Sequence, residues 1–286
     1  MRLTSKTLVL FPFLVIGCGG TAGRPLPPIP EPGREEPSVQ APSAHSWSFT
    51  YTPGVASYRV TRSATVESVS DPNPSREVTT NLTHETLTVE RVGDTIQFTM
   101  VADTFATTTQ NLVGPAQTSV VPIEIDGTMV HDTLRITDNT ASAPCVPAQS
   151  AIVADVRNIL VPFPAALEQG MVWTDSLGVS GCQAGIQTAA RSLRSFRVSG
   201  EVSYDGQPAV VIERADIIHA HGEGAQQQHR LILEVNGTGT VLYYLSTTSG
   251  QILHANATQD LNLTITASGK SQSFKQNLKQ EFALTR

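Results

Sequence analysis

Two histidines separated by one residue have the types and spacing that best suit metal chemistry. In His219-Ala220-His221 both imidazoles would lie on one face of a β-strand, because successive side chains of a strand alternate between its faces. Such a pair is one way to chelate a transition-metal ion. Glu223 and His229 lie nearby, but no motif fixes a third ligand. We therefore predict that no metal is needed. A metal-dependent protein or enzyme using His219 and His221 is the alternative.

The rest of the chain carries no catalytic signature. It has no Gly-x-Ser-x-Gly elbow, no Ser-x-x-Lys, no His-Glu-x-x-His and no phosphate-binding glycine loop. Asp132 and Asp216 interrupt apolar alternation and could form a paired acid site, although acids at such positions more often face solvent. Trp173, Tyr243 and Tyr244 could stack on a sugar, but aromatic residues at this density usually pack a core. We therefore expect no catalytic residues, no cofactor and no enzymatic activity.

The first 17 residues have the features of a bacterial signal peptide. A short basic start precedes an apolar run from Leu8 to Ile16, which is shorter than the ~20 residues of a membrane-spanning helix. The run ends in Val15-Ile16-Gly17-Cys18. This ending resembles the lipobox of bacterial lipoproteins. The resemblance implies cleavage before Cys18, a diacylglycerol on its sulfur and an acylated amino group. The alternative is an ordinary cleaved leader followed by an incidental cysteine.

The lipobox also implies a place for the chain in the cell envelope. Acyl chains on Cys18 would anchor it to a membrane, at about 0.8 kcal/mol for each buried methylene. Gly19 follows, and many Gram-negative lipoproteins kept at the inner membrane have aspartate there, so the outer membrane is favoured. Residues 18–46 are rich in proline, which predicts an extended tether of polyproline II type. A disordered terminus without a spacer role is the alternative.

The charge of the chain excludes some partners. The 286 residues have a net charge of −6, only 15% of them are charged, and no basic run occurs. Such a chain is a poor nucleic-acid binder and does not dock on anionic lipid by charge. We therefore expect contact with the membrane through the lipid alone.

The two remaining cysteines predict a disulfide. With Cys18 used by the lipid, Cys145 and Cys182 are left in an oxidising compartment, where two such thiols usually pair. Two free thiols or a metal pair are the alternatives. The bond would close a loop around the helix expected between Pro147 and Pro162, and would pin that helix to the sheet.

Residues 47–286 follow a period of two. Ile96, Phe98, Met100 and Ala102 alternate with more polar neighbours, and the runs 196–204, 230–235 and 261–266 behave in the same way. One buried and one wet face is typical of antiparallel sheet. Turn dipeptides between such runs predict hairpins. They are Gly93-Asp94, Asp126-Gly127, Asp205-Gly206, Asn236-Gly237, Ser249-Gly250 and Ser268-Gly269.

One segment has helical spacing instead. Ile152, Val156 and Ile159 fall on one face of the run bounded by prolines, so a helix of about three turns should pack its apolar face on the concave side of the sheet. The run through Phe274 and Phe282 fits either a helix or a strand, and we predict a strand because its neighbour is one. The blocks 47–140 and 164–286 could also be two similar halves.

These patterns predict a mainly β fold, with an antiparallel meander that forms an open or closed barrel-like sheet and one packed helix. This architecture is similar to the open half-barrels of bacterial lipoprotein carriers, in which a curved sheet wraps a helix and can hold acyl chains. No residue motif supports a transfer of binding residues from that family. The expected function is a non-enzymatic, membrane-anchored envelope lipoprotein that binds an apolar ligand or a partner protein.

Overall fold

The structure, a computed structural model, describes residues 45–70, 75–109, 117–119, 122–130, 133–137, 145–183, 186–226 and 229–285. The lipobox with Cys18, most of the tether and Asp132 lie outside these residues. The described residues form mainly β-strands, together with one helix. In chain order the elements are β1 (Ser46–Ser48), β2 (Gly54–Ser68), β3 (Arg76–Val92), β4 (Thr95–Thr109), β5 (Gln117–Ser119), β6 (Ile123–Val130), β7 (Thr133–Thr137), α1 (Pro147–Ile159), β8 (Ala166–Glu168), β9 (Val172–Gln183), β10 (Ile186–Tyr204), β11 (Gln207–Gln226), β12 (His229–Ser246), β13 (Ile252–Ala267) and β14 (Lys270–Thr285).

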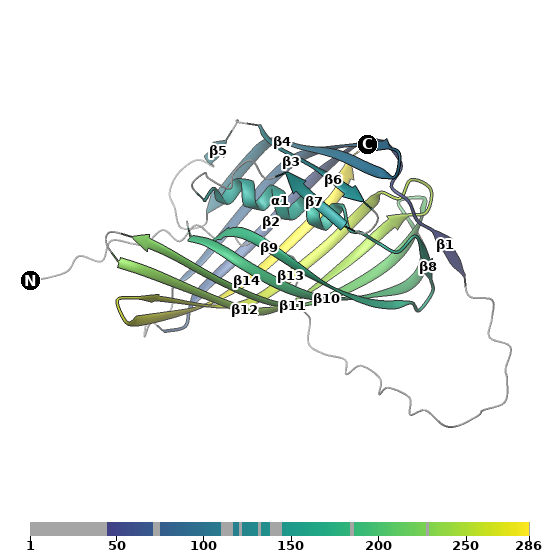
Figure 1. The fold of residues 1–286 in the computed structure, drawn as a ribbon. Helices are drawn as coiled ribbons and strands as arrows, with labels where there is room; N and C mark the ends of the chain where they lie inside the picture. The colour runs from purple at the N-terminus through teal and green to yellow at the C-terminus, as the bar shows by residue number, and fades with distance from the viewer. Residues whose placement is uncertain are drawn as a thin grey trace, which may run out of the picture.

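One antiparallel sheet dominates the molecule. Its hydrogen-bonded order is β7-β6-β4-β3-β2-β14-β13-β12-β11-β10-β9, with β5 paired to β4, and β1 and β8 form a separate pair. The sheet curls into a half-barrel around α1 (Figure 1). In the part of the chain that the structure describes, the end strands β7 and β9 do not pair, so the barrel is open. The predicted mainly β, barrel-like fold with one packed helix is confirmed.

The two strand-rich blocks of the sequence share this sheet. Strands β2 to β7 make one side and β9 to β14 the other, with α1 between them in the chain. The last strand returns to pair with the first long one, as in the register of Leu278 with Ala64 and of Phe282 with Val60. The predicted strand through Phe274 and Phe282 is β14.

The alternating pattern locates the buried face along most strands. Ile96, Phe98, Met100 and Ala102 of β4 are all buried, as expected. In β10 the alternation of buried and exposed side chains continues only to Val198. A β-bulge follows, and it shifts the register with β11 by one residue between Val198 and Gly200. The predicted inward pattern of residues 200–204 is therefore wrong, and Val202 is 41% exposed.

Four of the six predicted turns are turns in the structure, and two are not. Asp205-Gly206 and Ser268-Gly269 have the two positive φ angles that tight hairpins require. Gly127 and Gly237 instead lie inside β6 and β12. A Cβ at Gly127 would overlap the Arg135 carbonyl, and one at Gly237 would overlap the backbone of β13. These two glycines allow close strand contact in a strongly curled sheet rather than chain reversal.

The predicted helix is present as α1, with Pro147 in its first turn and Pro162 beyond its end. Ile152, Val156 and Ile159 are at most 1% exposed, so the predicted burial of its apolar face is confirmed. The helix contacts β4, β6 and β9 and lies on the concave side of the sheet (Figure 1). Burial of each of these side chains contributes roughly 1.5–3 kcal/mol.

The concave face is not purely apolar, because the polar side of α1 is also buried. Asp155 forms an ion pair with Arg62 of β2 and accepts a hydrogen bond of 2.5 Å from Gln280 Nε2. Arg62 Nη2 lies 3.2 Å from Glu85 Oε1, and Thr83 Oγ1 bridges the two, accepting from Arg62 Nη1 at 2.9 Å and donating to Glu85 at 3.0 Å. This group, the Arg62 cluster, anchors the middle of α1 to β2, β3 and β14.

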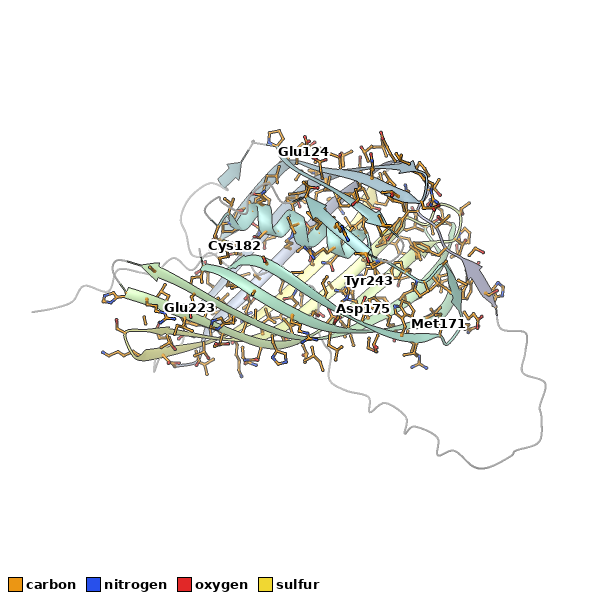
Figure 2. The ribbon with its side chains drawn as sticks, viewed as in Figure 1. Glu124, Met171, Asp175, Cys182, Glu223 and Tyr243 are labelled. Carbon is orange, nitrogen blue, oxygen red and sulfur yellow. A yellow bond between two sulfur atoms is a disulfide. The ribbon has the colours of Figure 1, made fainter. Side chains whose placement is uncertain are left out.

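Two further contacts fix the end of the helix. Asn158 Oδ1 accepts a hydrogen bond of 3.1 Å from Arg214 Nη2 on β11. Tyr51 donates to the Val161 carbonyl at 2.7 Å, just after the helix. The other end is fixed covalently, because Cys145 and Cys182 form the expected disulfide between the start of α1 and the end of β9 (Figure 2). The helix is thus held at its start, middle and end.

Candidate functional site

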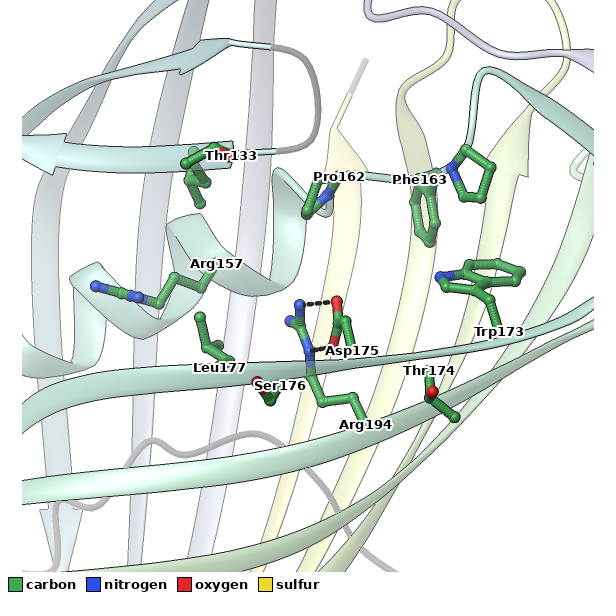
Figure 3. Close-up of a pocket in the computed structure, with 12 residues that line it drawn as sticks. Thr133, Arg157, Pro162, Phe163, Trp173, Thr174, Asp175, Ser176, Leu177 and Arg194 are labelled. Atoms are coloured by element: carbon green, nitrogen blue, oxygen red, sulfur yellow. Dashed lines mark hydrogen bonds and ion pairs between the residues drawn. The ribbon is translucent and has the colours of Figure 1, made fainter.

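A pocket opens at the gap between the two unpaired edge strands, β7 and β9, which we call the seam. The pocket has a volume of about 500 Å³, within the usual range for small-molecule sites. The end of α1 and the residues after it form one wall, and β9 forms the other (Figure 3). Its lining residues are Thr133, Leu134, Arg157, Pro162, Phe163, Pro164, Trp173, Thr174, Asp175, Ser176, Leu177 and Arg194.

Aromatic rings build one end of this seam pocket. Trp173 of β9 stacks on Phe196 of β10, with ring centroids 4.8 Å apart and planes at 2°. Phe163 lies at 6.4 Å from Trp173 and 6.3 Å from Phe196, and at 84° to both. Because it is equally distant from two stacked rings, Phe163 must lie beside the stack and not above it. The indole face turned away from Phe196 is therefore not covered by either ring.

An ion pair forms the floor of the seam pocket. Arg194 Nε donates to Asp175 Oδ1 at 2.6 Å, and Arg194 Nη2 donates to Asp175 Oδ2 at 2.5 Å. The two residues are register partners on β10 and β9, so both project to the concave side. Their side chains are 5% and 31% exposed, respectively. The Arg194 guanidinium also lies 5.4 Å from the Phe196 centroid, and this contact holds it next to the aromatic stack.

A second arginine lies deeper in the half-barrel. Arg214 Nε is 3.1 Å from Asp216 Oδ1, and its guanidinium also contacts Asn158 and the Tyr243 hydroxyl. Burial lowers the pKa of Arg214, while Tyr243 and Asp175 act in the opposite direction. Burial raises the pKa of Asp216 to about 8. The expectation that Asp216 faces solvent is wrong, because Asp216 is in phase with Ile212 and Ile218 along β11 and therefore lies on the buried face, at 4% exposure.

We expect the stability of the protein to fall as pH rises from 6 to 8 because of Asp216. Its folded pKa, about 8, lies above the unfolded value of about 3.9. Between these values the folded state keeps a proton that the unfolded state has lost, so the stabilisation present at low pH is lost toward pH 8. Relative to Asp216→Asn, the wild type should lose about 2 kcal/mol between pH 6 and pH 8. Urea unfolding of both proteins at three pH values measures this, and parallel pH profiles would contradict it.

The paired histidines lie away from the seam. His219 and His221 are on the outer face of β11, where His219 Nδ1 is 2.7 Å from Asn236 Oδ1 and His221 Nδ1 is 2.6 Å from Glu234 Oε1. Glu223, which also contacts His221, lies toward the opposite end of the strands from Tyr243 (Figure 2). Arg230 holds the pKa of Glu223 below its usual value. Within the described residues, no group of three or more His, Cys, Asp or Glu side chains could hold a metal ion.

Replacing both His219 and His221 by glutamine should change the free energy of unfolding by less than about 1 kcal/mol. Both imidazoles are on the exposed outer face, and their hydrogen bonds to Asn236 and Glu234 can be replaced by water. Urea unfolding with and without a chelator checks this expectation. If the double variant lost much stability, and a chelator caused the same loss in the wild type, the alternative of a metal-dependent protein would be supported instead.

Sequence reasoning did not find most of the seam pocket. The sequence offers Trp173, Tyr243 and Tyr244 as residues that could stack on a sugar. The structure separates the three: Trp173 lines the pocket, Tyr243 is fully buried, and Tyr244 belongs to an outer cluster with Tyr204 and His254. Asp175 and Arg194 were missed. Their only signal was opposite charge in the inward phase of two successive strands.

A second pocket of about 420 Å³ adjoins the first. It lies on the other side of the segment Pro162 to Pro164 and is also lined by Phe49, Tyr51, Arg91 and Met129. The rigid Pro-Phe-Pro segment thus separates two pockets, and Phe163 lines both.

No helix in the described ranges is long and apolar enough to cross a membrane.

Comparisons with known proteins give little guidance. No protein-family model matches the chain, and no curated protein matches it. DynF from the dynemicin biosynthesis pathway of Micromonospora chersina is 8% identical, with 91% of this chain and 92% of that chain covered and a TM-score of 0.25. A mutant of the Rh. blastica porin is 5% identical, with coverage of 80% and 100% and a TM-score of 0.25. A DUF1329 family protein from Desulfovibrio piger is 7% identical, with coverage of 78% and 83% and a TM-score of 0.15. TM-scores this low carry no argument about this chain.

Proposed function

We propose that the protein is a non-enzymatic lipoprotein of the bacterial cell envelope that binds a small ligand in the seam pocket. The lipid on Cys18 holds it to a membrane, the outer membrane rather than the inner one, and residues 18–46 let the half-barrel stand off from that membrane. The observation that carries the proposal is the seam pocket, a hollow of about 500 Å³ with a preformed aromatic end and a preformed ion pair.

The chemistry of the lining favours binding over catalysis. Asp175 and Arg194 are tied to each other by two hydrogen bonds, an arrangement that orients a ligand but leaves neither group poised to transfer a proton. Arg157 adds a second guanidinium, which offers hydrogen-bond donors and no acceptor, to the lining. The ring of Phe163 and its two flanking prolines give a rigid wall, so a ligand meets a site that needs little rearrangement.

The sequence predicts an apolar ligand or a partner protein, whereas the lining of the seam pocket supports a ligand that is partly polar. Half of the residues that line the pocket are polar or charged, and α1 occupies the middle of the concave face where acyl chains would otherwise lie. Burying the Asp175–Arg194 pair under an alkyl chain would remove water from it without offering hydrogen bonds in return. A ligand with both an apolar face and hydroxyl or amide groups fits this lining better.

The test is native mass spectrometry of the full-length protein, purified in detergent from envelopes of its host, for small molecules that remain bound. Leu177→Trp should fill the pocket, since Leu177 lines it. Ser180→Trp is the matched control, because Ser180 is exposed on the outer side of the same strand. We expect bound molecules in the wild type and in Ser180→Trp, and none in Leu177→Trp. A wild type without bound molecules, or equal occupancy in the three proteins, would defeat the proposal.

The anchor is tested separately. Wild-type protein expressed in its host should take up labelled fatty acid, whereas Cys18→Ala should remain unlabelled and accumulate as a precursor, because the thiol that carries the diacylglycerol is gone. Absence of label in the wild type would remove the lipoprotein part of the proposal and leave the pocket part intact.

A further inference from the structure

We infer that the ligand of the seam pocket is a saccharide, with one sugar ring stacked on the open face of Trp173 and its hydroxyls hydrogen-bonded to the Asp175–Arg194 pair. This inference rests on the proposed function, because it takes the seam pocket as the ligand site. It assigns a ligand class to the pocket around Trp173, one of the three aromatic residues that the sequence offers for stacking on a sugar.

The first support is the position of the Trp173 indole. One of its faces is covered by Phe196, while Phe163 lies beside both rings, so among the described rings none covers the second face. Trp173 lines the pocket and sits on the edge strand β9, with no further described strand beyond it. A large flat apolar surface turned toward a pocket is what the C–H face of a sugar ring stacks on, and the backing ring keeps the indole from turning.

The second support is the spacing of polar groups along β9. Trp173 and Asp175 are two residues apart on one strand and project to the same side, so their side chains start about 6.5–7 Å apart. The distance from the middle of a stacked sugar ring to a hydroxyl at its edge, plus the length of one hydrogen bond, approaches this spacing. Thr174 and Ser176, which alternate with them on β9, also border the pocket, but their side chains belong to the exposed phase of the strand.

The third support is the unused hydrogen-bonding capacity of the ion pair. A carboxylate offers about four acceptor sites and a guanidinium five donors, and the Asp175–Arg194 contact uses two of each. The pair therefore presents the partly exposed carboxylate as an acceptor, next to the remaining donors of the largely buried guanidinium. Neighbouring hydroxyls of a sugar, each able to donate and accept, satisfy both kinds of group at once. The carboxylate is 31% exposed and is reachable from the pocket.

The same geometry disfavours two other ligand classes. At the ion pair itself, a free anion would meet a guanidinium that Asp175 already neutralises, and that carboxylate would repel it. An acyl chain would cover Trp173 and Phe163 well but would leave the ion pair desolvated without new hydrogen bonds. A neutral polyhydroxy ligand with an apolar face avoids both costs.

The experiment uses tryptophan fluorescence of the full-length protein in detergent. The chain has two tryptophans, Trp47 and Trp173, so the variant Trp47→Phe makes the emission report on Trp173 alone. The probes are methyl glycosides of glucose, galactose, mannose and N-acetylglucosamine, with palmitic acid as the apolar comparison. We expect saturable change in Trp173 emission with at least one glycoside and none with palmitic acid. No response to any of the four glycosides would overturn the inference.

Variants locate the binding, which is followed by saturation-transfer NMR of the same glycoside. Trp173→Ala should weaken binding at least tenfold, and Trp173→Phe, which keeps a flat ring and the packing on Phe196, should stay within about threefold. Asp175→Asn should weaken binding about fivefold to tenfold. Tyr244→Ala is the matched control, because it removes an aromatic ring of the outer cluster, and it should leave binding unchanged. Equal binding by Trp173→Ala and the wild type would overturn the inference.

The failure of the inference and the failure of the proposed function give different results. If the glycosides do not bind but the wild type carries a copurified molecule that Leu177→Trp excludes, the pocket is a ligand site and the saccharide class is wrong. If Leu177→Trp retains the same copurified molecule as the wild type, the seam pocket is not the ligand site, and both the saccharide inference and the proposed function are wrong.

Discussion

Replacing Arg62 by methionine should lower the free energy of unfolding by about 3–5 kcal/mol, the cost of removing one partner from a buried ion pair. Arg62 is 1% exposed and lies between two carboxylates, Glu85 and Asp155, which are both fully buried. Methionine fills much of the same volume, so the loss reports the charge and not a cavity. Urea unfolding of the full-length protein measures the difference.

The reason lies in the two acids that the substitution leaves behind. Burial raises the pKa of Glu85, and Arg62 and Thr83 counteract that rise. Burial also lowers the pKa of Arg62, which Glu85 opposes. Without the guanidinium, two buried carboxyl groups must either stay charged near each other or bind protons from water at neutral pH. Either outcome costs free energy. Asp155 would also lose its link from α1 to β2.

Two variants control for this result. Arg76→Met makes the same change at the start of β3, where Arg76 Nε lies 3.5 Å from Glu67 and both side chains are largely exposed, and should cost less than about 1 kcal/mol. The triple variant Arg62→Met, Glu85→Gln, Asp155→Asn removes all three charges and should regain most of the loss. Equal effects of Arg62→Met and Arg76→Met would contradict the prediction.

The sequence predicted the elements of this fold because their signals are local. A period of two marked the long strands, such as β4 through Ile96 to Ala102, and helical spacing between prolines marked α1. The two errors in turn prediction have a common cause. Asp126-Gly127 and Asn236-Gly237 have the composition of hairpin turns, but curvature of the sheet used these glycines for close strand contact. That curvature depends on all strands together and leaves no separate mark at either dipeptide.

The inward charges were harder to predict. Arg214 and Asp216 occupy the same phase as Ile212 and Ile218, so the pattern itself placed them on the buried side. The general preference of charged side chains for solvent instead predicts that Asp216 is exposed. What decides between the two is whether a partner of opposite charge faces the position from another strand or from α1. Such pairing joins residues far apart in the sequence, as between Asp155 and Arg62.

The candidate site depends on which two strands form the edges of the sheet, and a single sequence does not contain that information. The two halves of the sheet are joined by the pairing of β14 with β2, and no pairing joins β7 to β9 in the described residues. β7 and β9 are therefore the two edges of the sheet. The seam pocket follows from that choice, since its walls are the two edges and the segment that connects them through α1. Trp173 could be singled out by type, but its open face follows from its place on an edge strand.

Removing the disulfide should also have a large effect, about 4 kcal/mol of stability for the double variant Cys145→Ala, Cys182→Ala. The bond closes a loop with a sequence separation of 37 residues, and its loss returns the corresponding chain entropy to the unfolded state. For a domain of this size, a change of 4 kcal/mol lowers the melting temperature by roughly 8–16 °C. Thermal unfolding followed by circular dichroism measures the shift. A reductant should lower the melting temperature of the wild type toward that of the double variant.

The same variant should loosen the seam pocket, because most of its lining lies within the closed loop. Arg157, the Pro162 to Pro164 segment and the residues from Trp173 to Leu177 all fall between the two cysteines. The Arg62 cluster and Tyr51 still hold α1 in the variant, so the fold should persist at low temperature while the walls of the pocket move more freely. Hydrogen exchange should therefore quicken in α1 and β9 and stay unchanged in β12 and β13. The double variant is itself the control for the reductant, which should not change it further. A melting temperature equal to that of the oxidised wild type would contradict the role of the disulfide.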